Sequence, residues 1–208
     1  MPSPSRVSKQ VIRATALAMI DRDGLDGLSM RKLAAELDVQ APSLYGYFAT
    51  KDELLHEIAD EIMAEVDTSD FACGDWMRGL RTWARSYRAA LAAHPNMVPL
   101  LASGPGRREV ALARADAVHG GLVVAGWPPR YATMIGASTK YLVLGAALGS
   151  FSRGFTEDVQ VYFDRYPNLA QAHRLAKYAD EIDTGSFELA LDAFLLGLQS
   201  LYAEVATR

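Results

Sequence analysis

A short segment near residue 45 carries hydroxyl, aromatic and ammonium groups at a spacing that suits contact with a nucleic acid. Ser43, Tyr45 and Tyr47 follow Pro42 at alternate positions, and Lys51 comes one helical turn later. Hydroxyl and ammonium groups bind phosphate oxygens, and an aromatic ring can contact a phosphate or a thymine methyl group. The chemistry indicated by these residues is recognition of a nucleic acid, not a covalent reaction.

Two short helices joined by a tight turn are predicted to position these side chains. Ser29 can cap the first helix, over residues 30 to about 37, by accepting a hydrogen bond from a free backbone amide. Pro42 begins the second helix, where a missing amide hydrogen is tolerated, and this helix extends to about residue 48. Leu44 and Phe48 are four residues apart and are predicted to anchor it on the first helix. The residues left to face outward are Ser43, Tyr45, Gly46 and Tyr47.

Longer helices are predicted on both sides of this pair. Apolar residues recur at helical spacing over residues 9–23, and Gly24 is placed to end that helix. Thr50 and Glu53 form a capping box at the start of another helix, expected over residues 51–66. The predicted inner face of this helix carries Leu54, Leu55, Ile58, Ile62 and Val66.

These residues resemble the helix-turn-helix of the TetR family of bacterial transcriptional regulators. The resemblance covers roughly Val11 to Leu55, and its most specific part is Leu44-Tyr45-x-Tyr47-Phe48 followed by Lys51 and Leu54-Leu55. It implies that the three N-terminal helices bind double-stranded operator DNA and that the remaining helices bind a ligand. Gly46 departs from the bulkier residue common in the family at that position, so one point of base readout is expected to be missing.

Some of the expected DNA-binding residues could contact either a base or the backbone, whereas others suit phosphate alone. Arg31 can reach either a guanine edge or a phosphate, and Gln40 can reach a base or only cover the turn. Ser43 and the amides around Pro42 suit phosphate, as does Lys51. The complete set of expected DNA-binding residues is Ser29, Arg31, Gln40, Pro42, Ser43, Tyr45, Tyr47 and Lys51.

Composition and charge favour a globular protein with a basic head. The 208 residues are 50% apolar and 22% charged, with a net charge of −4. Residues 1–51 hold seven Lys or Arg against five acids, so the rest of the chain carries −6. The single cysteine, Cys73, excludes an internal disulfide, and no signal peptide or membrane-spanning stretch is recognisable. We therefore expect a cytoplasmic protein without a membrane partner.

The rest of the chain also has helical patterns, so the predicted fold is all-α. We expect a DNA-binding domain with its linking helix over residues 1–66 and a ligand-binding and dimerisation domain over residues 67–208. The stretch from Phe187 resembles the closing helix of the subgroup that includes the tetracycline repressor. The family builds a homodimer from two helices per subunit, and the helices expected over 130–151 and 187–205 are the candidates. Residues 152–184 are expected to form a long polar loop with one embedded helix, over about 168–178.

Family resemblance places the effector pocket between Trp76 and Phe151. Aromatic, sulfur-containing and imidazole side chains there can line a pocket or belong to an ordinary core. The candidate ligand-binding residues are Trp83, Tyr87, Met97, His119, Trp127, Met134 and Tyr141. No two histidines have metal-ligand spacing on one helix, so neither a metal nor a cofactor is expected.

Two other classes of protein compete with a DNA-binding regulator. The chain has no glycine-rich phosphate loop, nucleophile elbow or paired-histidine motif, so an enzyme is not expected. An all-helical adaptor that binds other proteins and no DNA remains open, because most of the chain is acidic. The function expected is that of a homodimeric repressor released from its operator by a small, largely apolar molecule.

Overall fold

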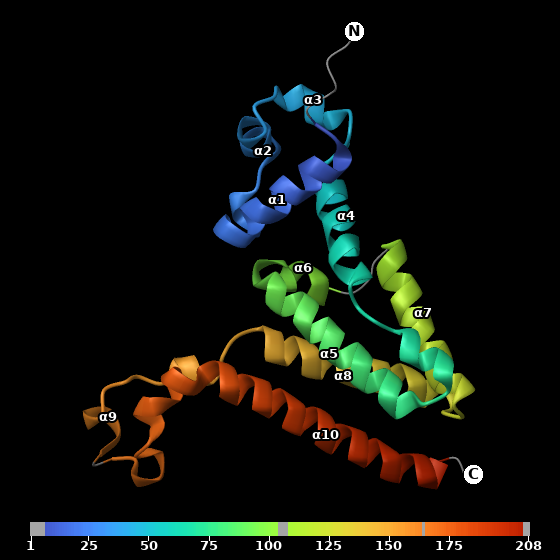
Figure 1. Cartoon of the computed structure of the whole chain (residues 1–208), viewed down its shortest axis with the longest axis vertical. Helices are drawn as coiled ribbons and strands as arrows, with labels where there is room; N and C mark the ends of the chain where they lie inside the picture. Colours follow the sequence, from blue (N-terminus) through green and yellow to red (C-terminus); the bar gives the residue numbers. More distant parts are fainter. Residues whose placement is uncertain (1–6, 104–107, 164, 206–208) are drawn as a thin grey trace. The chain divides into compact units, whose positions relative to one another are not determined.

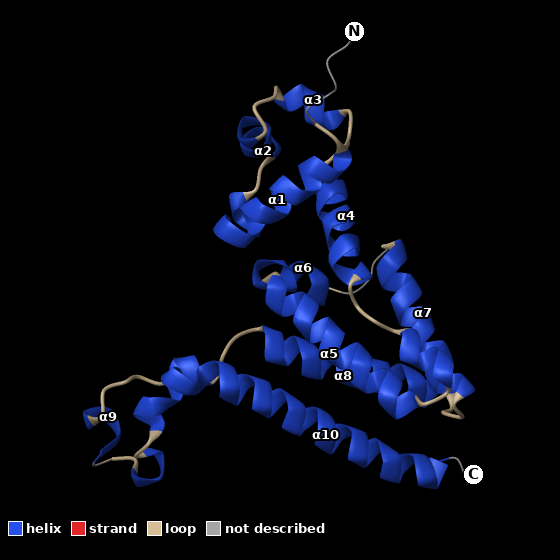
Figure 2. Ribbon diagram, in the orientation of Figure 1, coloured by secondary structure: helices blue, strands red, loops and turns tan. Residues whose placement is uncertain are grey.

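The computed structural model describes residues 7–103, 108–163 and 165–205. Helices connected by turns make up these residues, and the described ranges contain no strand (Figure 2). This confirms the predicted all-α fold class. None of the helices in these ranges is long and apolar enough to cross a membrane.

The chain divides into two compact units. The first consists of residues 1–67 and 89–117, and the second of residues 68–88 and 118–208. The first break lies one residue from the boundary predicted at 66, but residues 89–117 belong with the N-terminal unit. The functional division into 1–66 and 67–208 stays a prediction.

Within residues 7–67, the described N-terminal part of the first unit, the chain forms four α-helices (Figure 1). They are α1 (Lys9–Asp23), α2 (Met30–Glu36), α3 (Ala41–Tyr45) and α4 (Lys51–Ala64). Ser8 caps α1 by accepting a hydrogen bond from the amide of Val11, and Gly24, at φ 77°, ends it as predicted. A non-glycine residue would be strained at that angle.

A small apolar core joins these four helices. Its members come from every helix of the group, and each has an exposed fraction of 2% or less. They are Ile12, Ala16, Ile20, Leu33, Ala34, Leu44, Phe48, Leu54, Ile58 and Ile62. Because α2 and α3 are too short to be stable alone, burial in this core must hold them in place.

The remainder of the first unit comes from a later part of the chain. It begins in the last residues of α5 (Trp76–Ala93), continues through the 3-10 turn Pro95–Met97 and α6 (Val98–Ala102), and includes the first half of α7 (Glu109–Val124). The 3-10 turn packs against α1.

The second unit contains most of α5, the end of α7, α8 (Pro129–Ala147), α9 (Gln160–Phe163) and α10 (Ala179–Val205). The ring of Phe71 occupies a space that two glycines leave open. A Cβ atom would lie 2.7 Å from this ring at Gly79 and 2.6 Å from the Phe71 side chain at Gly121. The helices bearing these glycines can therefore approach Phe71 closely only because neither has a side chain there.

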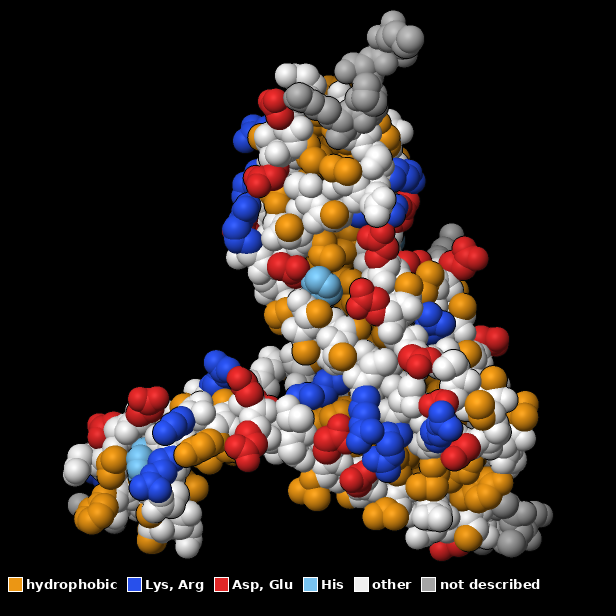
Figure 3. Space-filling model, viewed as in Figure 1, with side chains coloured by type: hydrophobic (Ala, Val, Ile, Leu, Met, Phe, Trp, Pro, Cys, Tyr) orange, Lys and Arg blue, Asp and Glu red, His pale blue; other side chains and the backbone are white. Residues whose placement is uncertain are grey.

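Arginines on one face of α5 bind α10. The guanidinium of Arg85 donates to Glu188 through Nε and Nη2, Arg81 pairs with Asp192, and Arg88 lies over the ring of Phe187, 4.9 Å from its centroid. Acidic and basic side chains accordingly meet where α5 and α10 run past each other (Figure 3). The attachment of α10 depends mainly on its buried side chains, Phe187, Leu191, Leu195 and Leu198, and these partly exposed ion pairs add a smaller contribution.

Two predictions for the C-terminal part were wrong. The last helix begins at Ala179, eight residues before Phe187, and the expected helix over 168–178 is two 3-10 turns, Pro167–Leu169 and Ala172–Tyr178. The polar composition of residues 179–186 concealed the first turns of α10. Exposed helical turns need no apolar periodicity, so the pattern reports only the packed part.

Candidate DNA-binding site

The first helix of the candidate site, α2, is fixed by its cap and by three buried side chains. The hydroxyl of Ser29 accepts a hydrogen bond from the amide of Lys32 at 3.2 Å, so the predicted cap is confirmed. Met30, Leu33 and Ala34 face the core, and Arg31 is exposed. Ser29 therefore has a structural role, while DNA contact by Ser29 or Arg31 stays a prediction.

A tight turn connects α2 to α3. Asp38 adopts a left-handed backbone conformation with φ 53°, and the amide of Val39 donates to the carbonyl of Ala34 at 2.9 Å. Aspartate tolerates this conformation better than most residues do. The turn places Gln40 at the N-cap of α3, where its side chain is exposed and makes no capping hydrogen bond.

Helix α3 has one buried face and one exposed face. Leu44 and, just beyond the helix, Phe48 are completely buried, as predicted from their spacing. Pro42, Ser43 and Tyr45 are exposed. The helix ends at Tyr45 instead of residue 48, with Gly46 as its C-cap.

The two tyrosines of this segment are in different environments. Tyr45 is 52% exposed, and no described residue bonds its hydroxyl. Tyr47 is half-buried, and its hydroxyl donates to the backbone carbonyl of Val7 at 3.0 Å. The prediction that Tyr47 faces fully outward was wrong, because its hydroxyl is bonded to the start of the described chain. Tyr45 is therefore the more accessible of the two side chains.

Lys51 also has an intramolecular partner. Its ammonium group donates to the carbonyl of Leu25 at 3.0 Å. The predicted capping box is confirmed beside it, since Thr50 accepts from the amide of Glu53 at 3.0 Å. The Glu53 carboxylate in turn accepts from the amide of Ala49 at 2.6 Å. Lys51 thus lies on the first turn of α4, oriented by its bond to Leu25.

Ion pairs hold α1 to α4 beneath the site. Glu57 accepts hydrogen bonds from Lys9 and Arg13, each at 2.9 Å, and Arg13 also pairs with Glu61 at 2.7 Å. The bond to Glu61 is the largest influence on Arg13 and, with that to Glu57, raises the guanidinium pKa above its ordinary value. Burial works to raise the pKa of Glu57, but its two cationic donors outweigh burial and lower it.

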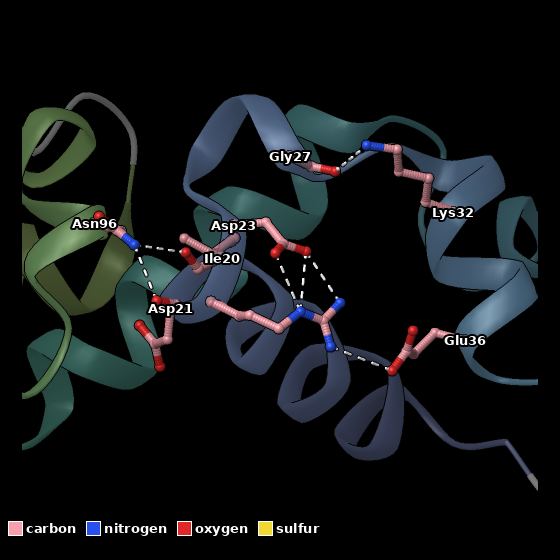
Figure 4. Close-up of polar contacts among 8 residues, drawn as sticks. Ile20, Asp21, Asp23, Gly27, Lys32, Glu36 and Asn96 are labelled. Atoms are coloured by element: carbon pink, nitrogen blue, oxygen red, sulfur yellow. Dashed lines mark hydrogen bonds and ion pairs between the residues drawn. The ribbon is translucent and has the colours of Figure 1, made fainter.

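Sequence reasoning missed a second group of polar contacts around the loop between α1 and α2. Arg22 pairs with Asp23 at 3.0 Å and with Glu36 at 3.6 Å, and the ammonium of Lys32 donates to the carbonyl of Gly27 at 3.1 Å (Figure 4). The hydrogen bond from the Arg22 guanidinium lowers the pKa of the Asp23 carboxyl. No helical periodicity signals such contacts, because most of their partners lie on different elements.

The candidate effector residues lie on several different elements. Trp83 and Tyr87 are buried on α5 with stacked rings, 6.2 Å between centroids. Trp127 packs instead against Trp76 and Tyr202, at 5.3 and 5.0 Å between centroids. Of the other four, Met97 is buried in the first unit, His119 is half-buried on α7, and Met134 and Tyr141 are 43% and 72% exposed on α8.

Tyr141 instead borders an open groove between α8 and α10. The groove has a volume of about 460 Å³ and includes Phe151, Phe187 and Asp183 in its lining. Across the described part of the chain, His, Cys, Asp and Glu side chains nowhere form a group of three that could hold a metal ion.

Two known protein families match successive parts of this chain. The description "Bacterial regulatory proteins, tetR family" matches residues 12–58, and "Tetracyclin repressor-like, C-terminal domain" matches residues 70–202, more than half of the chain. The chain belongs to the TetR family. Its members are DNA-binding, ligand-responsive transcriptional regulators and not enzymes.

Characterised relatives include several tetracycline repressors. The chain is 38% identical over 141 residues to the class A tetracycline repressor of transposon 1721 from Escherichia coli, covering 66% of this chain and 64% of that protein. It is 31% identical over 140 residues to an HTH-type transcriptional regulator of Saccharopolyspora erythraea, covering 67% and 59%. These two matches span less than two thirds of each relative. A class E tetracycline repressor from E. coli aligns over 94% of this chain and 92% of its own length at 27% identity.

Solved structures of the family share the whole fold. A possible TetR family transcriptional regulator from Streptomyces coelicolor A3(2) superposes with a TM-score of 0.74 at 30% identity, covering 93% of this chain and all of that one. ActR from S. coelicolor, in complex with (S)-DNPA, also gives 0.74, at 27% identity and with coverage of 94% and 98%.

Proposed function

We propose that this protein is a homodimeric repressor of the TetR family that inserts α3 into the major groove of a roughly palindromic operator. The observation that carries the proposal is the division of α3 and its flank into a buried face, Leu44 and Phe48, and an exposed face, Ser43 and Tyr45. The ring and hydroxyl of Tyr45 are thereby accessible on the outer face of a helix of five residues, where they can contact DNA.

The proposed contacts divide by chemistry. The hydroxyl of Ser43, at the start of α3, binds phosphate, and Tyr45 reaches a phosphate or a thymine methyl group. Arg31, exposed on α2, supplies a guanidinium for a second phosphate or a guanine. Lys51 binds phosphate with the donors that its bond to Leu25 leaves free, since an ammonium group has three. Gln40 and Tyr47 take secondary positions at the ends of α3.

The dimer interface is proposed on α8 and α10. Met134, Tyr141 and Leu148 recur every seven residues along α8 and its C-cap with exposed fractions of 43%, 72% and 74%. On α10, Leu189 and Leu196 are also seven apart and are 73% and 62% exposed. Large apolar side chains in such rows are typical of a surface that a second helix pair covers. Two-fold pairing of this surface presents two copies of α3 to two operator half-sites.

The effector is proposed to be a small, largely apolar molecule. The support is the pair of stacked aromatic side chains on α5, Trp83 and Tyr87, together with the ligands of structural relatives. One solved structure of ActR contains actinorhodin. A variant of TetR from Acinetobacter baumannii AYE has been solved in complex with minocycline. No metal is proposed to accompany the effector here.

The test is selection of duplexes from a random pool with the full-length protein, followed by fluorescence anisotropy over a range of salt concentrations. We expect a palindromic site that binds one dimer, and an affinity that falls steeply with salt because phosphate contacts release counterions. Failure to select any duplex would overturn the proposal and favour the adaptor.

A pair of matched variants tests the assigned face. Tyr45→Ala should weaken binding at least about tenfold, since it removes an exposed side chain that contacts each half-site. Tyr166→Ala is the control, because Tyr166 is 50% exposed, like Tyr45 at 52%, but lies between α9 and α10. Equal affinities for the two variants would reject α3 as the helix that contacts the operator.

A further inference from the structure

The last carbonyls of α1 and α4 are hydrogen-bonded by side chains from a distant part of the sequence. The final turn of any helix leaves carbonyls without an amide partner from the same helix. In α1, Ile20 and Asp21 lie in that region, and Asn96 donates its side-chain amide to both carbonyls, at 2.9 and 3.0 Å (Figure 4). The carbonyl of Ile20 also accepts from the amide of Gly24 at 2.8 Å, so Asn96 is an additional donor there. In α4, Arg114 donates to the carbonyl of Ala64 at 2.9 Å.

An imidazole strengthens the contact with α1. Asp21 places a carboxylate near the C-terminal end of the helix, where the backbone dipole disfavours negative charge. The Nδ1 atom of His94 lies 2.9 Å from that carboxylate. His94 and Asn96 thus supply donors to the acceptors that cluster at the end of α1.

The turn that carries Asn96 is anchored by a buried neighbour. Asn96 lies in the 3-10 turn Pro95–Met97, and the side chain of Met97 is fully buried. The turn follows α5 directly, and α5 is continuous from Trp76 to Ala93. A displacement of the C-terminal end of α5 would therefore carry Asn96 with it.

We propose that Asn96 and His94 are positioning residues for DNA binding, which fix the end of α1 to residues 94–97 and so set the orientation of α2 and α3. Arg114 does the same for the end of α4. The expected effect on DNA binding rests on the proposed function. The attachment of α1 to residues 94–97 does not depend on it.

The chain provides a matched control within its own sequence. Asn168 occupies a second 3-10 turn, Pro167–Leu169, and the residues before the two prolines have nearly equal backbone angles: φ −135° and ψ 63° at His94, φ −133° and ψ 70° at Tyr166. Unlike Asn96, the side chain of Asn168 is exposed and makes no hydrogen bond to any described residue. Making the same substitution at both positions distinguishes loss of the hydrogen bonds to α1 from any effect of the substitution on the 3-10 turn itself.

The experiment compares Asn96→Asp and Asn168→Asp in the full-length protein by hydrogen exchange and by operator affinity. Asn96→Asp replaces two donated bonds by a carboxylate facing two carbonyl oxygens. We expect exchange in residues 17–27 to rise about tenfold and operator binding to weaken by about the same factor, with exchange in α8 and α10 unchanged. Asn168→Asp should change neither. Asn96→Ala, which removes the donors without adding a charge, should give a smaller effect in the same direction.

Unchanged exchange at residues 17–27 in both Asn96 variants would overturn the link. Faster exchange there with wild-type operator affinity would overturn the positioning role, because a local contact alone would then explain the result. The exchange measurement needs no DNA. A wild-type protein that binds no selected duplex would therefore contradict the proposed function, while the exchange contrast would still decide whether residues 94–96 hold α1.

Discussion

The ammonium group of Lys51 donates a hydrogen bond to the backbone carbonyl of Leu25, 26 residues earlier in the chain, at 3.0 Å. Leu25 begins the short 3-10 turn that follows α1, whereas Lys51 is the first residue of α4. The bond therefore ties the loop before α2 to the helix after α3. Lys51, which was predicted to bind DNA phosphate, therefore also stabilises the fold around α3.

The substitution Lys51→Met tests this double role. Methionine retains most of the aliphatic length and removes the donor, so we expect the free energy of unfolding to fall by about 1 kcal/mol, the net contribution of one partly exposed hydrogen bond. Operator affinity should fall as well. Chemical denaturation and anisotropy measure the two effects, and Lys177→Met, on the surface beside Tyr178, is the control. Wild-type stability with weakened DNA binding would leave Lys51 a role at phosphate only.

Tyr47→Phe removes only the hydroxyl that donates to Val7. We expect a loss of about 0.5–1 kcal/mol in the free energy of unfolding, because the carbonyl then loses a partner while the ring remains packed. Tyr45→Phe, whose hydroxyl has no bond to a described residue, should leave stability within about 0.5 kcal/mol of the wild type. If the two variants were equally stable by denaturation, the bond to Val7 would carry no net stabilisation.

Local signals in the sequence predicted the elements of the site well. Ser29 and Thr50 cap the helices as expected, and Leu44 and Phe48 are buried because their spacing puts them on one face. Cap and periodicity signals are local, so the sequence contains them. The bonds of Tyr47 to Val7 and of Lys51 to Leu25 join residues 40 and 26 positions apart, and no local pattern encodes them.

The environment of the candidate effector residues could not be predicted in this way. Trp83 and Trp127 are candidates because of their size, but a large aromatic side chain fits a core as well as a pocket. The structure places Trp127 against Trp76 and Tyr202, a different environment from that of Trp83 beside Tyr87. Side-chain type alone does not distinguish these environments. Gly24, in contrast, marks the end of α1 directly, because the backbone angle there favours glycine.

Two adjacent glycines in α7 are expected to respond in opposite ways to a methyl group. At Gly121 a Cβ atom would lie 2.6 Å from the Phe71 side chain, whereas at Gly120 nothing lies within 4 Å. Gly121→Ala should destabilise the protein by about 1–3 kcal/mol through overpacking. Gly120→Ala should be neutral or stabilising by up to about 1 kcal/mol, because alanine is the better helix former. Thermal unfolding compares them, and a stable Gly121→Ala protein would mean that Phe71 can move.

Acid should weaken the ion pairs between α1 and α4 through Glu57. Its pKa is lowered in the folded protein because hydrogen bonds from Lys9 and Arg13 outweigh burial. The ordinary value, 4.5, applies to the unfolded chain. Stabilisation by Glu57 is thus fully present above pH 4.5 and is lost as the pH falls through the lower, folded-state pKa.

Glu57→Gln removes that titration and provides the measurement. The wild type should be more stable than the variant at neutral pH by no more than about 1 kcal/mol, since the pair is partly exposed and screened. This difference should shrink below pH 4.5 and should also shrink in high salt. Glu157→Gln is the control, because Glu157 forms no ion pair with any described residue. A stability difference that stayed constant from neutral pH to about pH 3 would assign the contribution of Glu57 to packing of its methylene groups, and charge attraction between α1 and α4 would be excluded as its source.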